Sequence, residues 1–451
     1  MLNSSRQRSV SSVYPWFIVS CGILFYCYNY FLRSAPSVLQ NELIQSLHIT
    51  AYQFGILASA YYWAYTPMQI PAGMLYDKFG VRVVIGTAIL MGVLGLYIFL
   101  NADTLAIAWL GRFIIGAGCA FAYIGTLKLA SIWLPANMFA TAAGVTTAIG
   151  MTSGALTQRF ISHSVQTTGD YHVPMHWGLM VGVILSVVVF LCVRNKPANS
   201  ANSVDMHSAL NLSQLLGSLK LIFKNPQMWL IGAIGCLLYL PASVCLDAYG
   251  KEFLINVYGI TTQDAINIAN LTSLGWIISG PIVGIYSDKV KRRVNSLRLS
   301  TVLAAALLIL VFYQSHLFGI WGLYAIFFAI GISCGGHALC FPLGKENNPV
   351  RISGTSVAVT NAFIMVGGII FPPIVGKLLD MHTHGIGVNG LPVHTANDYI
   401  LAMSVIPLGI ALSVILTFFV KETHCKVIET PEDELASSPA VLVNEKNLEV
   451  A

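Results

Sequence analysis

Apolar stretches of about 20 residues or more recur along almost the whole sequence, and they constrain the fold more than any other feature. A helix rises about 1.5 Å per residue, so roughly 20 apolar residues cross the hydrocarbon core of a bilayer. Hydrophobic residues make up 56% of the 451-residue chain and charged residues only 10%. The sequence therefore predicts an all-α polytopic membrane protein. Its twelve predicted spans are residues 14–39, 51–76, 83–101, 105–134, 139–162, 176–193, 228–252, 262–286, 298–314, 317–343, 354–379 and 399–420.

Basic residues between these spans predict the orientation of the chain. The first apolar stretch is too long for a secretory signal and no small-residue cleavage site follows it, so we expect it to be retained. With the N-terminus inside, Lys and Arg gather in the cytoplasmic loops, which is the positive-inside pattern. The net charge of +5 thus reflects topology and not nucleic-acid binding. We expect a monomer in a cytoplasmic (inner) membrane, with both termini in the cytoplasm and the lipid bilayer around it.

The chain is built twice on one plan. Asp77 and Asp288, like Ile49-Thr50 and Ile260-Thr261, recur at an offset of about 210 residues. Such repeats indicate two pseudo-symmetric six-helix bundles. Thr50 and Thr261 are either helix N-caps or loop threonines. The predicted parts are an N-terminal bundle (1–193), a cytoplasmic linker with an amphipathic helix (194–227), a C-terminal bundle (228–420) and a disordered cytoplasmic tail (421–451).

Two charged decapeptides, "GMLYDKFGVR" and "GIYSDKVKRR", join the second and third helices of each half. Glycine allows helix ends to approach, an aspartate caps or pairs with a neighbouring helix, and basic residues lie at the inner headgroups. We interpret both as cytoplasmic gate motifs. Their residues are Gly73, Asp77, Lys78, Gly80 and Arg82 in the first, and Gly284, Asp288, Lys289 and Arg292 in the second.

These motifs resemble those of a known family over nearly the entire chain. Gly73-x3-Asp77-Lys78-x-Gly80-x-Arg82 is similar to the loop signature of the major facilitator superfamily, and "GRFIIGAGCAFAYIG", which contains Arg112, is similar to its fourth-helix motif. Asn29-Tyr30-x2-Arg33 resembles the first-helix pattern of the anion:cation symporter branch, with Leu32 where that branch usually has an acid. The fifth helix lacks the Gly-Pro element of the drug/proton antiporters. The resemblance implies secondary transport by alternating access.

Ionisable residues inside predicted spans are costly and are functional candidates by default. Arg33, near the outer end of the first span, either binds a solute carboxylate bidentately or reaches towards the interface. Lys128, about two turns before Pro135, is expected to face a cavity or a buried partner. Tyr30, Tyr62, Gln158 and Asn361 are the polar aromatic and amide residues that we expect to line the same solute-binding cavity.

Three further residues are candidates for proton coupling, each with a structural alternative. Arg112 either takes part in coupling or ties helix ends together through main-chain carbonyls. Asp247 either carries a proton from a shielded position or forms a local i,i+4 ion pair with Lys251. His337, among the glycines of "GISCGGHALC", is either a proton relay or a core histidine with satisfied hydrogen bonds.

Eight of the eleven histidines fall on the predicted outer face, where they are either a solvated surface or sensors of external acidity. They are His48, His163, His172, His176, His316, His382, His384 and His394.

The remaining chemistry points away from enzymes and metal proteins. The cysteines lie mostly inside spans, without CxxC or Cys/His ligand spacing, and there is no nucleotide loop. We expect no metal, no cofactor and no enzymatic activity. The sequence predicts a secondary transporter for proton-coupled uptake of a small carboxylate-bearing solute: an organic acid anion, an amino acid or a short peptide. The rivals are a proton-antiport exporter of a drug or siderophore, and a nutrient receptor that does not transport.

Overall fold

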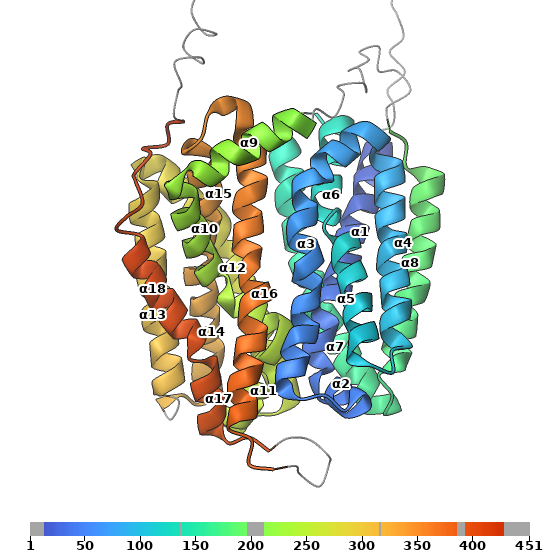
Figure 1. Ribbon diagram of the computed structural model, residues 1–451, viewed down its shortest axis with the longest axis vertical. Coiled ribbons are helices and arrows are strands. Elements are labelled where there is room, and N and C mark those ends of the chain that lie inside the picture. The colour runs from blue at the N-terminus through green and yellow to red at the C-terminus, as the bar shows by residue number, and fades with distance from the viewer. Residues whose placement is uncertain (1–12, 136–137, 196–211, 315–316, 386–392, 428–451) are drawn as a thin grey trace, which may run out of the picture. The chain divides into compact units, whose positions relative to one another are not determined.

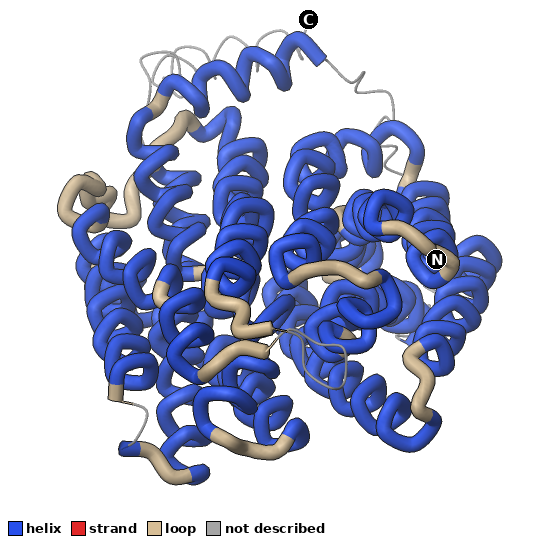
Figure 2. The backbone as a smooth tube through the Cα atoms, turned by 60° about the horizontal axis from the view of Figure 1, so that its bottom comes forward, coloured by secondary structure: helices blue, strands red, loops and turns tan. Residues whose placement is uncertain are grey.

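The computed structural model describes residues 13–135, 138–195, 212–314, 317–385 and 393–427. Every regular element in these ranges is a helix, as Figure 2 shows. Ten helical stretches, counted within those ranges and some of them made of two or more adjoining helices, are long and apolar enough to cross a membrane. The other two predicted spans, 51–76 and 139–162, correspond to the helices Ala51–Phe79 and Phe139–Thr168, which have 29 and 30 residues but are less apolar. The predicted all-α polytopic fold is confirmed.

The chain forms two compact units, whose described parts lie within residues 13–195 and 212–427. The helices of the first unit (Figure 1) are α1 (Val13–Val38), α2 (Gln40–Leu47), α3 (Ala51–Phe79), α4 (Val81–Leu100), α5 (Leu105–Cys119), α6 (Ala122–Trp133), α7 (Phe139–Thr168) and α8 (His172–Cys192).

The second unit begins with the amphipathic helix α9, the described part of the predicted linker, which lies across the ends of its unit's helices in Figure 1. Residues 196–211 of that linker lie outside the described ranges. The α-helices are α9 (Leu212–Lys224), α10 (Pro226–Leu238), α11 (Gly250–Tyr258), α12 (Thr262–Val290), α13 (Arg293–Tyr313), α14 (Ile320–Cys334), α15 (Cys340–Glu346), α16 (Ser353–Met381), α17 (Ala396–Met403) and α18 (Val405–Leu416).

Local sequence explains where several helices start. Thr50 and Thr261 are the N-caps of α3 and α12, which decides between the two alternatives that the sequence left open. The Thr50 hydroxyl accepts from Gln53 N at 3.3 Å while the Gln53 side chain accepts from Thr50 N at 2.9 Å, forming a capping box. The Thr261 hydroxyl accepts from Asp264 N at 3.1 Å.

Several predicted spans are interrupted rather than continuous. The span 228–252 becomes α10, a π-helix over Pro241–Tyr249 and α11. Pro241 lacks the N–H that would continue α10, which accounts for the break. The fourth span of each half is also interrupted: α5 and α6 are separated at Ala120–Phe121, and α14 and α15 are separated by a 3₁₀ turn over Gly335–Leu339.

Close glycine contacts pack equivalent helices in both units. A Cβ at Gly116 of α5 would lie 2.0 Å from the Tyr61 carbonyl oxygen of α3. A Cβ at Gly331 of α14 would lie 2.1 Å from the Thr272 carbonyl oxygen of α12. The glycines are 215 residues apart and their contact residues 211 apart, so the backbone-to-backbone contact recurs in both halves.

Candidate functional site

A buried polar cluster joins α1, α3 and α5 in the first unit. Arg33 is only 7% exposed, donates from Nη2 to the Tyr62 hydroxyl at 2.9 Å, and lies 5.4 Å from the centre of that ring. Beside it, the Tyr61 hydroxyl donates to Asn29 Oδ1 at 2.8 Å. Burial and these bonds show that Arg33 does not extend into lipid as a surface residue would.

Arg112 contacts the same cluster and is 2% exposed. Its Nη1 donates to the Leu32 carbonyl at 2.7 Å, and its guanidinium lies 5.4 Å from the centre of the Tyr61 ring. A bond to a main-chain carbonyl of α1 is the arrangement that the structural alternative for Arg112 requires. It fixes the turn of α1 that carries Arg33.

The other predicted cavity residues are only partly brought together. Tyr30 lies one turn before Arg33 but packs against α7, where a Cβ at Gly154 would lie 2.9 Å from its ring. Gln158, on α7, is buried. Asn361 lies on α16 in the second unit and is half-buried. Arg33 and Tyr62 are therefore the two predicted solute-binding residues whose contact the structure specifies.

Lys128 forms an ion pair with a residue of the first gate motif. Its ammonium lies 2.7 Å from Asp77 Oδ1, and the two side chains are 39% and 57% exposed. Lys128 thus has a partner, but this partner is the partly solvated aspartate of the first gate motif and not a buried group. Lys128 and Asp77, predicted for different roles, form one ion pair between α6 and α3.

The first gate motif is held mainly by α8 and the residues after it. Gly80 has a φ of +78°, and a Cβ there would lie 2.5 Å from the Asn195 side chain, so this position requires glycine. Arg82 donates through Nη2 to the Phe190 carbonyl and through its main-chain N to Asn195 Oδ1 at 3.0 Å.

Two other motif glycines have open space beside them. A Cβ at Gly73 or at Gly284 would meet no atom within 4 Å. Close approach of helix ends at these positions stays a prediction. The observed contacts of the two gate motifs are made by their charged residues and, in the first motif, also by Gly80.

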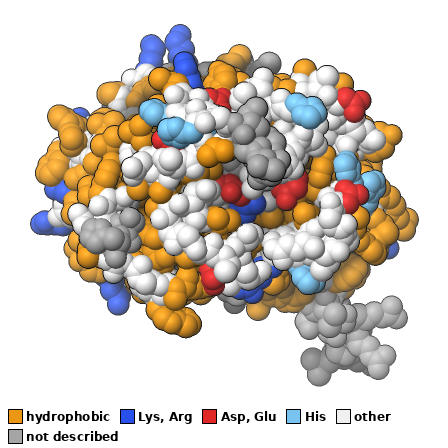
Figure 3. Space-filling view, turned by 90° about the horizontal axis from the view of Figure 1, so that it is seen from below, with side chains coloured by type: hydrophobic (Ala, Val, Ile, Leu, Met, Phe, Trp, Pro, Cys, Tyr) orange, Lys and Arg blue, Asp and Glu red, His pale blue; other side chains and the backbone are white. Residues whose placement is uncertain are grey.

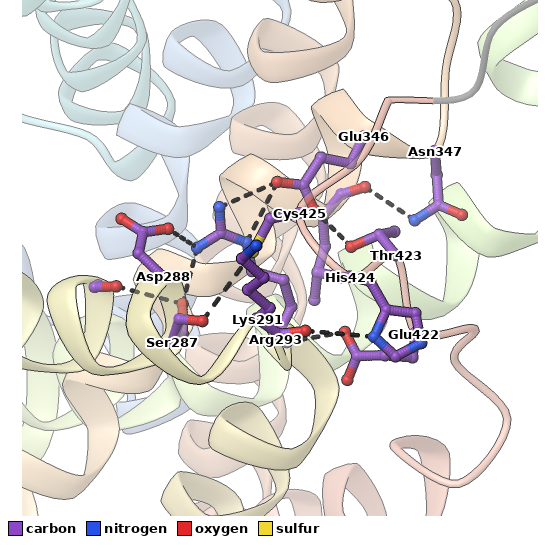
Figure 4. A network of polar contacts seen from close by, with 12 residues as sticks. Ser287, Asp288, Lys291, Arg293, Glu346, Asn347, Glu422, Thr423, His424 and Cys425 are labelled. Atoms are coloured by element: carbon purple, nitrogen blue, oxygen red, sulfur yellow. Dashed lines mark hydrogen bonds and ion pairs between the residues drawn. The ribbon is translucent and has the colours of Figure 1, made fainter.

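The second gate motif centres on Arg293 and not on the predicted Arg292, which is exposed (Figure 4). The buried Arg293 donates from Nη1 to Asp288 Oδ1 at 2.5 Å and to the Ser287 hydroxyl at 2.7 Å. Its Nε and Nη2 lie 3.1 and 3.0 Å from Glu346 Oε1. The two adjacent arginines differ in burial. Arg292 is the non-helical residue before α13, whereas Arg293 is the first residue of the helix and is buried.

The first residues of the predicted disordered tail bind to this motif (Figure 4). Glu422 accepts from the main-chain N of Arg293 at 2.7 Å and of Val294 at 3.0 Å, so it caps α13, whose own N-cap residue makes no side-chain bond. The Thr423 hydroxyl donates to Glu346 Oε2. Disorder is therefore wrong for residues 421–427, while 428–451 lie outside the described ranges. Glu422 lies 129 residues from Arg293, and Thr423 lies 77 residues from Glu346, so no local sequence pattern predicts these contacts.

Asp247 lies in the π-helix and not in the regular helix that the i,i+4 argument assumed. Lys251, its expected partner, has its ammonium 3.1 Å from Glu252 Oε1, and these two side chains are 11% and 9% exposed. The buried Glu252 was not singled out from the sequence.

His337 is partly buried in the 3₁₀ turn between α14 and α15. Trp276 of α12 donates from Nε1 to His337 Nδ1 at 2.8 Å. The Tyr239 and Trp276 rings lie 5.9 and 4.9 Å from the imidazole. The histidine thus has a specific hydrogen-bond partner in its own unit.

The sequence matches the profile of the Major Facilitator Superfamily over residues 19–372. The chain belongs to this superfamily. The probable galactarate/D-glucarate transporter GarP of Escherichia coli is 25% identical over 387 residues, which cover 79% of this chain and 86% of GarP. The human choline/ethanolamine transporter FLVCR2 is 24% identical over 397 residues, covering 84% and 73% of the two chains.

Solved transporter structures share the fold. A mutant of the nucleoside transporter NupG superposes with a TM-score of 0.68 at 14% identity, over 89% of this chain and 98% of that one. Together with the profile match, this identifies a multi-pass membrane transporter and confirms the family resemblance of the two gate motifs and the fourth helix.

The histidines of this superfamily member lie mostly at helix ends. Figure 3 shows histidine and acidic side chains on the face where α2 and α17 lie. His48 follows α2 and His172 begins α8, whereas His384 Nε2 lies 3.1 Å from Asp398 Oδ2. The backbone N–H and then the imidazole of His172 lower the pKa of Asp170. Burial lowers the pKa of His394. His316 lies outside the described ranges.

The cysteines and possible metal ligands have no special arrangement. All nine cysteines are free, and several are buried in packed helices. Within the part of the chain that the structure describes, no three His, Cys, Asp or Glu side chains form a metal-binding group.

Proposed function

We propose that this transporter carries a small carboxylate-bearing solute inward, together with protons, and that hydroxylated dicarboxylates such as galactarate and D-glucarate are the first candidates. The proposal retains the predicted bundles 1–193 and 228–420, the cytoplasmic termini and a monomeric state. GarP supports the solute class because its name assigns it these sugar acids.

The observation that carries the proposal is the buried guanidinium of Arg33. A guanidinium has five N–H donors, and Tyr62 accepts from Nη2 at 2.9 Å. A carboxylate takes two parallel N–H donors from an arginine, which gives both energy and orientation. The acids of residues 1–195 are Glu42, Asp77, Asp103 and Asp170, and Asp77 pairs with Lys128. The buried positive charge of Arg33 supports an anionic solute.

Lys128 belongs to the gate in this proposal and not to the solute site. Its charge is compensated by Asp77 at 2.7 Å, and both side chains are solvated. A pair of this kind opens and closes at low cost because water screens both charges.

Proton coupling is proposed to involve Asp247. It lies in the irregular π-helix of the second unit, and such insertions are frequent at functional sites. Arg112 is proposed to support Arg33 instead, since its Nη1 is bound to the Leu32 carbonyl.

An organic cation is the second candidate solute. FLVCR2 is named as a choline/ethanolamine transporter. The Tyr26 ring lies 5.2 Å from Tyr30 and 5.3 Å from Tyr123, and aromatic clusters bind quaternary ammonium groups through cation–π attraction. The buried charge of Arg33 opposes this candidate.

A thermal-shift screen of the purified protein tests the solute class. We expect galactarate or D-glucarate to stabilise the wild type and Lys128→Gln, but not Arg33→Gln. The exposed Arg351→Gln is the matched control that removes an arginine elsewhere and keeps the stabilisation. Stabilisation by choline alone, or equal stabilisation of Arg33→Gln, would reject the carboxylate proposal.

Reconstitution then separates the three modes of action. A transporter exchanges labelled solute across the membrane in counterflow, whereas a receptor binds without exchange. An acidic outer medium drives accumulation by a symporter and extrusion by a proton antiporter. Asp247→Asn is expected to keep counterflow and to lose acid-driven accumulation.

A further inference from the structure

A groove of about 290 Å³ lies at α3 and α4 of the first unit, beside the first gate motif. Leu75 and Phe79 of α3 contribute to its lining, together with Val83, Thr87 and Met91 of α4. Phe79, Val83 and Met91 are exposed large apolar residues. The groove is therefore open to the surroundings of the protein.

The lining offers an apolar surface to whatever enters the groove. Thr87 is the polar side chain among the lining residues, and its hydroxyl donates to the Val83 carbonyl at 2.8 Å. A polar ligand would give up its hydrogen bonds to water there without replacing them, which is costly. The lining thus favours an apolar occupant.

The part of the groove on α4 runs along one face of a candidate membrane span. Val83, Thr87 and Met91 follow at intervals of four residues, so they form one row on the helix. The row covers about 12 Å of the helix axis. Because spans are tilted only modestly from the bilayer normal, an occupant of this row lies roughly parallel to the acyl chains of the bilayer.

Two cationic side chains lie at the end of the groove near the gate motif. The Lys78 ammonium, in the last turn of α3, lies 5.1 Å from the centre of the Phe79 ring. Arg82 directly precedes Val83 and is exposed. The neighbouring acid, Asp77, is already paired with Lys128. Among the residues that the structure describes, Lys78 and Arg82 form no ion pair.

We propose that this groove binds one phospholipid, with an acyl chain along the row on α4 and the phosphate beside Lys78 and Arg82. The predicted orientation of the chain puts this headgroup in the inner leaflet. Basic pockets between membrane helices on that side bind anionic headgroups. The two cations therefore favour phosphatidylglycerol, which has a net negative charge, over zwitterionic phosphatidylcholine.

The lipid also contacts the interruption between α5 and α6. Phe121 lies at this interruption and belongs to the lining of the groove. Its carbonyl accepts from the Tyr76 hydroxyl of α3 at 2.7 Å. The bound acyl chain thus packs against a residue that connects α3 to the break in the fourth span. This site is independent of the proposed solute, because none of its residues binds the carboxylate.

Native mass spectrometry of the purified full chain, titrated with phosphatidylglycerol or phosphatidylcholine, tests the proposal without any solute. We expect one phosphatidylglycerol to bind the wild type more tightly than all further lipids. Its affinity should exceed that of phosphatidylcholine by about fivefold or more, because each basic residue near the headgroup adds roughly that factor.

Two substitutions fill the groove from its exposed rim. Val83→Trp and Met91→Trp should each raise the apparent Kd of this phosphatidylglycerol by about tenfold or more. Val183→Trp is the matched control, because Val183 of α8 is 46% exposed, like Val83 at 44%, and lies outside the lining. It should keep the tight site. Melting temperatures of the three variants show that each is folded.

The headgroup contact is tested at the gate motif. Lys78→Gln should lower the affinity for phosphatidylglycerol by about fivefold and leave that for phosphatidylcholine unchanged. Lys289→Gln, the equivalent change in the second motif, is the control that retains the tight site. Glycerol phosphate, which has the headgroup chemistry without acyl chains, should not displace the lipid.

Three results would overturn the proposal. The first is an unchanged affinity for phosphatidylglycerol in both Val83→Trp and Met91→Trp. The second is displacement of the lipid by glycerol phosphate, which would show an anion site that needs no acyl chain. The third is a dimer of the wild type that both groove variants convert to a monomer, which would show that the groove holds a second copy of this chain.

Discussion

Removing the Glu422 carboxylate should destabilise the second unit by releasing the start of α13. Both carboxylate oxygens accept main-chain N–H groups there, at 2.7 and 3.0 Å, and Arg292 supplies no side-chain cap. Loss of a cap costs about 0.5–2 kcal/mol, and a carboxylate at a helix N-terminus contributes about 0.3–1 kcal/mol through the helix dipole. Because these contributions overlap, we expect Glu422→Ala to lower the free energy of unfolding by about 1–2 kcal/mol. Glu422→Gln, which retains one acceptor oxygen, should lose about half as much.

Labelling of Cys425 measures the same contact directly. Its thiol lies 3.9 Å from the Ser287 carbonyl oxygen, and desolvation raises its pKa, so a maleimide should react slowly while the tail is bound. Glu422→Ala is measured both by the rate of Cys425 labelling and by unfolding. Truncation after Lys421 removes Cys425, so this variant is measured by unfolding alone. Truncation after Val427 is the matched control, since it removes only residues beyond the contact. Unchanged labelling and unchanged unfolding in Glu422→Ala would refute the capping role.

Three other predictions concern the gate, the outer face and the packing. In a double-mutant cycle, Lys128→Gln and Asp77→Asn should show a coupling energy of about 0.2–1 kcal/mol, and this energy should decrease with added salt. A salt-independent coupling energy of several kcal/mol would contradict the solvated geometry of the pair. The pKa of Asp170 is lowered in the folded protein, so its stabilising contribution is present above about pH 4 and is lost as pH falls through the lowered value. The melting temperature of the wild type should therefore fall more between about pH 5 and 3 than that of Asp170→Asn. Gly331→Ala should prevent accumulation of folded protein, because its Cβ would lie 2.1 Å from a carbonyl oxygen; normal yield and melting temperature would show that α12 and α14 can separate.

Local sequence determined the parts of the fold that could be predicted. Apolar length located the spans, and the caps Thr50 and Thr261 lie three residues before the groups they bind. The repeat of the gate motif in the second half could be found by comparing the two halves of the sequence. The π-helix was not predicted, although Pro241 signals a break, because a proline does not specify which irregular helix follows.

The missed residues depend on contacts between distant segments. Arg292 and Arg293 are equivalent in sequence, and only the position of Glu346, 53 residues later, selects Arg293. The bond between Trp276 and His337 spans 61 residues, so no local sequence pattern predicts it. Lys128 was recognised as a charge that needs a partner, but Asp77 was already assigned to the gate, so their pairing was not anticipated.

Uptake of radiolabelled D-glucarate into proteoliposomes, with an acidic outer medium, decides whether Arg33 binds the solute. We expect accumulation by the wild type, loss of binding and accumulation in Arg33→Gln, and retention of both in Arg351→Gln. Full accumulation by Arg33→Gln, with an unchanged apparent affinity, would contradict the claim that the buried guanidinium on α1 binds the solute.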